Sequence, residues 1–300
     1  MSRHKLVPDN RGIEHTGIQL PGEPQKWLHG RKRSLQSRRL SHQQTVQQLS
    51  ELLAKHEWTW PGRTVYFFSD LHADADALTA SLIASGGVKV SGKKHRHLKL
   101  TRQGKQAQFL IGGDCFDKGP SNLALLRTLK KLHDRGARMR ILAGNHDIRV
   151  MLGMRNVNRK VDPGCEHFFV RMGAKSVPFL KELNDNYLAG AHSLKDVPGK
   201  QQCEQRLYPP EQWFDMFPQE VADLLPQKII DKELRRVIEK RDDFEAQCDE
   251  AGLSIRRAYA AALQWQRLFL RDKGEFSWFF RRMRLAMHRG SFLFLSLIHI

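Results

Sequence analysis

Three short apolar runs in the first half of the chain predict buried β-strands. They span residues 64–68, 107–111 and 139–142, and the first, Thr-Val-Tyr-Phe-Phe, is apolar or β-branched throughout, as in a strand covered on both faces. Between them, residues 74–84 and 122–133 place apolar side chains on one helical stripe. The order strand, helix, strand, helix, strand predicts an α/β fold with an open sheet and helical crossovers.

Less regular patterns surround this core. Residues 41–53 have helical spacing, with a serine at the first position that can cap the helix. Residues 86–108 alternate between apolar and polar positions around a basic turn, which predicts a basic hairpin. After about residue 156 the strand pattern disappears, and residues 224–246 and 253–284 are charged and helix-favouring.

These patterns divide the chain into four expected segments. We expect a basic flexible arm over residues 1–40, the N-terminal part of the α/β domain over 41–155, and a long helical insertion or cap over 156–286. The near-helical spacing of the aromatic residues in the insertion favours core positions over a platform that stacks on a ligand. Residues 287–300 predict the start of a buried strand that returns to the core. Because the last five residues resemble translated sequencing adapter, we expect the domain to be incomplete at its C-terminus and to continue beyond Ile300.

The net charge of the chain indicates which classes of partner it could bind. The chain of 300 residues has 50 Lys and Arg against 32 Asp and Glu, a net charge of +18. Such a charge favours a phosphorylated substrate, a nucleic acid or an anionic membrane surface, although a solvated basic surface without a special partner explains it equally well. The same two readings apply to the basic cluster of the arm, which consists of Arg31, Lys32, Arg33, Arg38 and Arg39.

Cysteine use and hydropathy indicate a cytoplasmic protein. The four cysteines form no C-x-x-C pair, so the sequence predicts neither a disulfide framework nor a zinc knuckle. The N-terminal residues lack the apolar stretch of a signal peptide, and no apolar run reaches the length of about 18 residues that spans a membrane. We therefore expect a reducing compartment and no membrane span.

A polar cluster follows each of the three predicted strands, where open α/β sheets bind their ligands. Asp70 and His72 follow the first strand, Asp114 follows the second, and Asn145 follows the third. Carboxylate, imidazole and amide ligands suit Mn, Fe, Zn or Ni. Two such ions about 3.5–4 Å apart can generate a bridging hydroxide and neutralise a phosphoryl group under attack. The clusters thus predict two divalent ions and phosphoester chemistry.

Each cluster alone also has a structural explanation. An Asp-x-His at a strand end can cap the following helix, Gly-Gly-Asp is a common turn, and Asn-His-Asp can be an N-cap pair. Three such clusters, each after a strand and before a helix, are harder to explain as caps and favour one shared site.

The motifs resemble those of the calcineurin-like metallophosphoesterase family, whose pattern is Asp-x-His, Gly-Asp-x-x-Asp-Arg-Gly, Gly-Asn-His-Asp or Gly-Asn-His-Glu, and then two later histidines. Here they are Asp70–His72, Gly113–Gly119 and Gly144–Asp147, so the resemblance covers about residues 64–155. It implies a core of β-sheet layers flanked by helices. It also implies that Asp70 and His72 hold the first metal ion, that Asp114 bridges the two ions, and that Asn145 holds the second.

The resemblance makes His146 the proton donor to the leaving oxygen and Asp117 the residue that orients its ring. The chemistry agrees, because an imidazole titrates near neutral pH and a carboxylate partner fixes its tautomer. Lys118 stands where the family has arginine, so it offers a substrate phosphate a point charge instead of a two-pronged guanidinium. The basic hairpin, with Lys93, Lys94, Arg96 and Lys99, could compensate or could simply be a solvated face.

The two later histidines have no clear counterpart. His192 and His288 lie near glycines, but neither follows a predicted strand, so either could be an ordinary surface residue. Two hypotheses follow. The first is a metal-dependent phosphoester hydrolase that uses a metal-bridging hydroxide on a phosphomonoester or phosphodiester. The second is a basic nucleic-acid-binding or scaffolding protein that keeps the fold with an incomplete metal site.

Overall fold

The computed structural model describes residues 59–91, 97–158, 162–190 and 194–296, together with 43, 44, 46, 47, 50, 51 and 54, which are helical. Several predicted features lie outside these residues: the basic arm over residues 1–40, the serine cap at residue 41, the tip of the basic hairpin, His192 and the last four residues. The described residues fall into two units, one within residues 65–286 together with 295 and 296, and the other of the described residues up to Thr64 together with 287–294.

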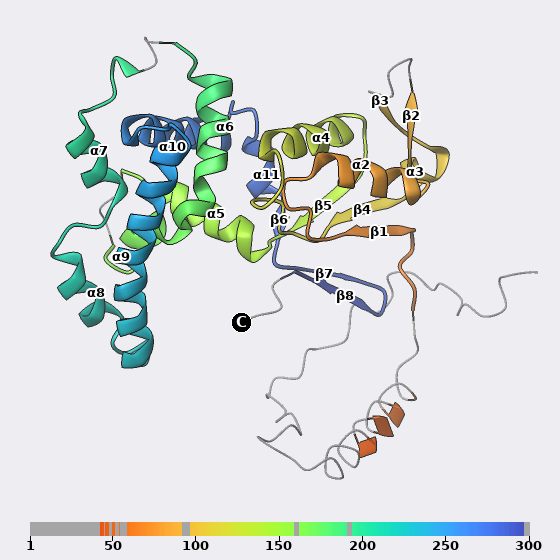
Figure 1. Cartoon of the computed structure of the whole chain (residues 1–300). Helices are drawn as coiled ribbons and strands as arrows, with labels where there is room; N and C mark the ends of the chain where they lie inside the picture. Colours follow the sequence, from red (N-terminus) through yellow and green to blue (C-terminus); the bar gives the residue numbers. More distant parts are fainter. Residues whose placement is uncertain are drawn as a thin grey trace, which may run out of the picture. The chain divides into compact units, whose positions relative to one another are not determined.

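The larger unit is built on a four-stranded parallel sheet (Figure 1). Its order is β1 (Val65–Phe68), β4 (Gln108–Ile111), β5 (Arg138–Leu142) and β6 (Met283–Arg284). The register aligns Phe68 with Ile111 and Ile111 with Ile141, so the carboxyl ends of β1, β4 and β5 lie at the same edge. The α/β fold with an open sheet is therefore confirmed.

The fourth strand corrects the sequence analysis. Met283 and Arg284 were expected at the end of a helical segment, but they pair with Ile141 and Leu142 of β5, and Arg284 also accepts a hydrogen bond from the Ala143 amide at 2.9 Å. A strand of two residues has no periodicity of its own, so only its partner strand determines it.

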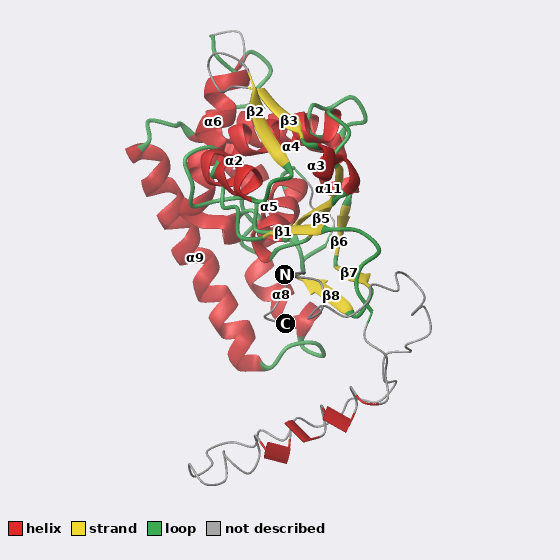
Figure 2. Cartoon of the chain, turned by 90° about the vertical axis from the view of Figure 1, so that its right-hand side faces the viewer, coloured by secondary structure: helices red, strands yellow, loops and turns green. Residues whose placement is uncertain are grey.

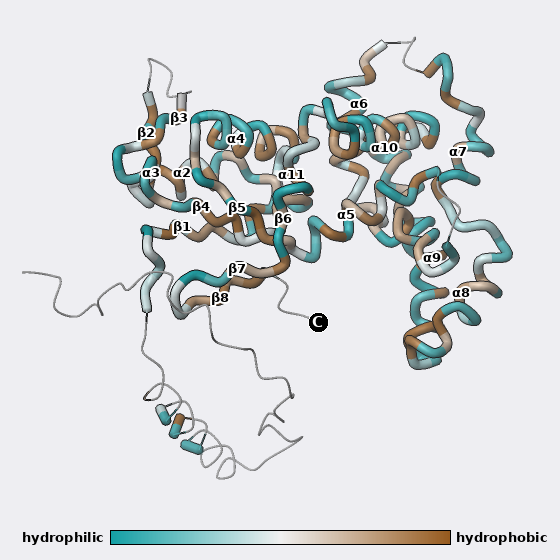
Figure 3. The backbone as a smooth tube through the Cα atoms, turned by 180° about the vertical axis from the view of Figure 1, so that it is seen from behind, coloured by the Kyte–Doolittle hydropathy of each residue, from teal (hydrophilic) through white to brown (hydrophobic). Residues whose placement is uncertain are grey.

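Burial of the first strand also differs from the prediction. In β4 and β5, Phe109, Leu110, Ile111, Ile141 and Leu142 are fully buried, whereas Phe67 of β1 remains 44% exposed. Its neighbours Tyr66 and Phe68 point to the opposite face and pack against the core. The edge strand is thus covered on one face, although its sequence resembles that of a strand buried on both. Figure 3 shows the apolar character of β4 and β5 inside the unit.

Helical crossovers connect the strands as predicted. α2 (Ala75–Ala84) and α4 (Asn122–Asp134) lie on the same face of the sheet (Figure 1). Their N-caps are Asp74 and Ser121, whose side chains accept hydrogen bonds from backbone amides of the first turn. The predicted basic hairpin is the antiparallel pair β2 (Val88–Ser91) and β3 (His97–Leu100), which the short helix α3 (Arg102–Gln106) connects to β4.

From α5 onward the larger unit is mainly helical (Figure 2). The elements are α5 (Asn145–Asn156), the 3₁₀ segments η1 (Glu166–Phe168) and η2 (Val170–Ser176), α6 (Val177–Tyr187), α7 (Lys200–Leu207), α8 (Trp213–Val221), α9 (Gln227–Glu250), α10 (Ile255–Leu270) and α11 (Ser277–Arg281).

One aromatic cluster joins this helical part to the sheet. Phe116, in the loop after β4, packs against four aromatic rings at centroid distances of 5.5–6.2 Å: Phe179, Phe269, Phe279 and Phe280. Phe116, Phe179, Phe269 and Phe279 are fully buried. The boundary expected between residues 155 and 156 therefore lies inside one compact unit with a continuous core.

The smaller unit contains a two-stranded sheet of β7 (Ala286–Arg289) and β8 (Phe292–Leu295), with Ala286 and Leu295 counted in the larger unit. A strand, β8, forms within residues 290–295 as expected, but among the described strands it pairs with β7 and does not join the four-stranded sheet, and Leu293 is 55% exposed. Phe292 packs on Trp60 at 5.2 Å, and the amide of Ser291 donates to the carbonyl oxygen of Thr59 at 2.8 Å.

No helix within the described part of the chain is both long and apolar enough to cross a membrane.

The aromatic cluster gives a stability prediction. Replacing Phe116 with alanine leaves a cavity among four rings and should lower the free energy of unfolding by about 3–5 kcal/mol, measured by urea denaturation. Leu224→Ala is the control, because Leu224 is 78% exposed and its truncation should change stability by less than about 0.5 kcal/mol. Equal effects of the two substitutions would show that the sheet and the helices do not share this core.

Candidate metal centre

Backbone hydrogen bonds continue from β1 and β4 into the loops that follow them. The amide of Gly112 donates to the Phe68 carbonyl oxygen at 2.6 Å, and the amides of His72 and Ala73 donate to the carbonyl oxygens of Asp114 and Cys115 at 2.8 Å. The two loops are therefore held in register beyond the ends of their strands. This pairing places the first and second polar clusters side by side.

The backbone of these loops is strained. Seven non-glycine residues in the described part have positive φ, and six of them belong to the two loops: Asp70, His72, Ala73, Asp114, Asp117 and Lys118. Each such conformation costs on the order of 1 kcal/mol or more and persists only where the surroundings impose it. Strained residues of this kind concentrate at functional sites.

A buried carboxylate connects the second loop to the third. Asp147 accepts hydrogen bonds from the amides of Gly144 at 3.0 Å, Asp114 at 2.9 Å and Cys115 at 2.8 Å. Burial raises the pKa of Asp147 to about 7, although the amides of Gly144 and Cys115 act in the opposite direction. This side chain therefore binds the loop after β4 to the first turn of α5.

Two glycines permit the close approach of these loops. A Cβ atom on Gly144 would lie 2.2 Å from the amide nitrogen of Asp114, and one on Gly119 would lie 2.0 Å from the carbonyl oxygen of His72. No side chain fits at either position without moving backbone. Packing alone therefore requires glycine at these two motif positions, whether or not the site is catalytic.

The loops bring three of the predicted metal ligands together. One ligand atom from each of Asp70, His72 and Asp114 lies within 4.8 Å of the others. The ring of His72 is oriented by its Nδ1, which lies 3.4 Å from the carbonyl oxygen of Phe116. That contact assigns the proton to Nδ1 and leaves Nε2, 3.8 Å from Asp70, as the nitrogen available to a metal ion.

Asn145 adds a fourth group from the first residue of α5. With its amide nitrogen toward Asp114, it donates to the carboxylate at 3.1 and 3.2 Å. Turned by 180°, the amide presents its oxygen beside the same carboxylate, as a ligand to a cation must. The oxygen and nitrogen donors of this cluster fit a divalent metal ion.

His146 and Asp117, the predicted proton donor and the residue that orients its ring, also form a pair. His146 Nδ1 lies 3.0 Å from a carboxylate oxygen of Asp117, and both side chains are at least 90% buried. The backbone amide of His146 donates to Asp114 at 3.0 Å, and its ring lies 5.2 Å from that of His72. The acid–base candidate is thus positioned against the candidate metal ligands.

Lys118 lies at the same site. Its Nζ is 3.1 Å from His72 Nε2, the nitrogen that faces the cluster. An ion bound at His72 requires the ammonium group to move away, and the long exposed side chain of Lys118 can do so.

Contacts from the helical part support the His146–Asp117 pair. Glu182 of α6 accepts hydrogen bonds from the Ser121 hydroxyl and from the amides of Asn122 and Leu123, so it caps α4. Asn122 in turn accepts a hydrogen bond from the Asp117 amide at 3.2 Å. A chain of contacts therefore runs from α6 to the backbone of Asp117, whose carboxylate faces His146.

Within the described residues of the larger unit, no later histidine of the family pattern joins these ligands. Asp70, His72 and Asp114 form the one candidate metal cluster of at least three His, Cys, Asp or Glu side chains within the described residues. His192 lies outside those residues, and His288 belongs to the smaller unit. Of the predicted ligands for a second ion, the described residues include Asp114 and Asn145.

Asp147 and Glu182 are not among the predicted site residues. Asp147 closes the Gly-Asn-His-Asp motif, and its position at the third residue of a helix that starts with glycine was a usable signal for a capping carboxylate. Glu182 had no comparable signal, because its partners are more than 50 residues away in the sequence.

Asp147→Asn tests the connection between the loops. The amide has the same shape, but it replaces one acceptor with a donor that faces backbone N–H groups. We expect a loss of roughly 1–3 kcal/mol in the free energy of unfolding and weaker Mn²⁺ binding, measured by denaturation and calorimetry. Asp223→Asn, at an exposed turn, should change neither. Unchanged stability of the Asp147 variant would show that this carboxylate does not hold the loops.

Comparison with known proteins agrees with this geometry. A model of the calcineurin-like phosphoesterase family matches residues 63–242, from β1 into α9, and thus includes every predicted site residue. The match extends beyond the motifs into the helical part. No curated protein and no solved structure matched the chain. With more than half of its length covered by the family model, the chain belongs to the calcineurin-like phosphoesterase family, whose members are metal-dependent phosphoester hydrolases.

Proposed function

We propose that this chain hydrolyses a phosphomonoester or phosphodiester with the help of two divalent ions. Asp70, His72 and Asp114 hold one ion, and Asp114 and Asn145 contribute to the other. The observation that carries the proposal is the convergence of the three carboxylate and imidazole ligands within 4.8 Å, next to a buried His–Asp pair. The mixed nitrogen and oxygen donors suit Mn, Fe, Zn or Ni.

Bound ions would lower the pKa of water and neutralise phosphoryl charge. The chain's own residues supply the rest. Because Nδ1 of His146 is engaged by Asp117, Nε2 is the nitrogen that can give a proton to the leaving oxygen. Burial of both side chains holds the ring in one orientation, so the proton donor is already in place.

Lys118 is the proposed contact for a substrate phosphate. Its ammonium group reaches His72 across the site, and it is the exposed cation of the loop after β4. A phosphoryl group at the centre would offer it a stronger partner than a neutral imidazole. A reducing cytoplasm is the proposed compartment, supported by four free cysteines, three of them buried.

Hydrolysis of an aryl phosphate with Mn²⁺ tests the assignment. His146→Gln should lower kcat by about 10²–10⁴-fold, because it removes the proton donor, while metal content stays unchanged. Asp114→Asn should lower both activity and metal content. His133→Gln is the matched control, since His133 also contacts an aspartate, Asp134, but lies in the last turn of α4. Full activity of the His146 variant would contradict the proposed role.

A nucleic acid remains the second candidate partner, on the basis of the net charge of +18. If it binds through phosphate contacts, the logarithm of its affinity should fall linearly with the logarithm of salt concentration, by about 0.9 per phosphate neutralised on a duplex. Fluorescence anisotropy with a labelled duplex between 50 and 200 mM salt, roughly the range over which such binding weakens strongly, measures the slope. Binding without salt dependence, or no binding, would remove this candidate.

A further inference from the structure

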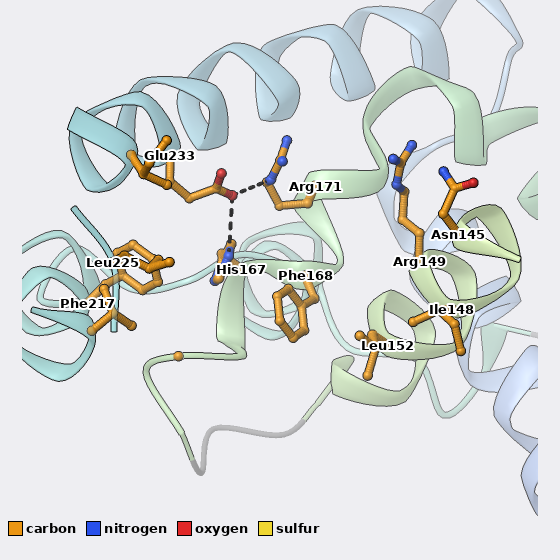
Figure 4. A pocket seen from close by; sticks show the side chains of 13 residues that line it. Asn145, Ile148, Arg149, Leu152, His167, Phe168, Arg171, Phe217, Leu225 and Glu233 are labelled. Atoms are coloured by element: carbon orange, nitrogen blue, oxygen red, sulfur yellow. Dashed lines mark ion pairs between the residues drawn. The ribbon is translucent and has the colours of Figure 1, made fainter. Parts of the chain in front are cut away.

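A cavity of about 480 Å³ begins at Asn145 (Figure 4). One wall is a single face of α5, formed by Asn145, Ile148, Arg149 and Leu152. Their spacing of three, four and seven residues places all four side chains on that face. The helix that presents a candidate metal ligand in its first turn therefore continues as the wall of the cavity.

The opposite wall is mostly apolar and comes from η1, α8, α9 and the residues around them. It includes Phe168, Phe217, Val221, Leu225 and Ile229. Cavities of roughly 300–1,000 Å³ lined in this way hold small organic molecules. The size and lining fit the apolar group of a small substrate.

The charged groups of the opposite wall compensate one another. Glu233 forms an ion pair with Arg171 and lies 3.4 Å from His167 Nε2 (Figure 4). Burial alone would raise the pKa of Glu233, but His167 and Arg171 outweigh it and lower the pKa. These three side chains therefore leave no strong net attraction for an anion.

Arg149 differs from them. Within the part of the chain that the structure describes, its side chain forms no ion pair and no hydrogen bond, and it is exposed. Figure 4 shows it beside Asn145, one helical turn further along α5. A guanidinium binds two phosphoryl oxygens at once, which Lys118 cannot do. Among the described residues that line the cavity, Arg149 is thus the basic side chain that no carboxylate compensates, and it lies next to the candidate metal ligand Asn145.

We propose that the substrate is a phosphoester with an apolar organic group, which occupies this cavity while Arg149 binds an oxygen of the phosphate. The inference rests on the proposed hydrolase function and names its substrate class. Arg149 would act as the second phosphate contact beside Lys118, from α5 instead of from the loop after β4. The apolar wall would give affinity for the organic group.

Alkylphosphonates, which are not hydrolysed, test the cavity with the Mn²⁺-loaded full chain. Calorimetry of the series from methylphosphonate to octylphosphonate should show Kd falling roughly fourfold per methylene until the cavity is filled. Ile229→Glu should remove this dependence on chain length. Ile238→Glu is the matched control on the same helix, because the two isoleucines are 44% and 45% exposed and only Ile229 lines the cavity.

Arg149→Gln should weaken binding of every phosphonate by about tenfold or more, because it removes a charged phosphate contact. Arg155→Gln, on the same helix but outside the cavity wall, should bind like the unmodified chain. Equal affinity for the short and long phosphonates, or equal effects of the two arginine substitutions, would overturn the inference.

Aryl phosphate hydrolysis separates this inference from the function on which it rests. If the chain hydrolyses an aryl phosphate but binds short and long phosphonates equally, the substrate class is wrong and the hydrolase function stands. A metal-loaded chain that hydrolyses no phosphoester overturns the function and the substrate assignment together. Both are supported if the chain hydrolyses an aryl phosphate and if its phosphonate affinity depends on chain length in a way that Ile229→Glu removes and Ile238→Glu retains.

Discussion

The buried carboxylate of Asp147 is the contact on which the candidate centre depends. It accepts three backbone amide hydrogen bonds from two loops, and the loop after β4 is in turn hydrogen-bonded to the loop after β1. Without it, the second and third polar clusters would be linked mainly through Asp114. Burying a carboxylate is costly by itself and raises its pKa. The three amide donors and the position beside the candidate metal ligands offset that cost.

Backbone strain and its support are distributed over different parts of the fold. The positive φ angles occur in the loops after β1 and β4, while much of the support comes from the helices. Glu182 caps α4, and the aromatic rings around Phe116 fix the middle of the second loop. The helical part is therefore not a separate appendage, because it holds the backbone that presents Asp114 and Asp117.

The sequence predicted the parts of the molecule that depend on local pattern. The strands before Asp70, Asp114 and Asn145 and the helices after them follow from apolar periodicity and capping residues, and the parallel sheet brings their ends together. Contacts between distant segments were not predictable. Met283 and Arg284 become a strand only because β5 is present, and Glu182 becomes a cap only because α6 packs beside α4. The local sequence does not distinguish Arg149 from any other helical arginine, because its place on the cavity wall depends on η1, α8 and α9.

Anomalous diffraction from crystals soaked with manganese locates bound ions without relying on turnover. We expect a manganese peak in contact with Asp70, His72 and Asp114, and a second peak between Asp114 and Asn145. A fully occupied manganese site elsewhere on the chain, with no peak at these side chains, would show that they do not form the metal centre.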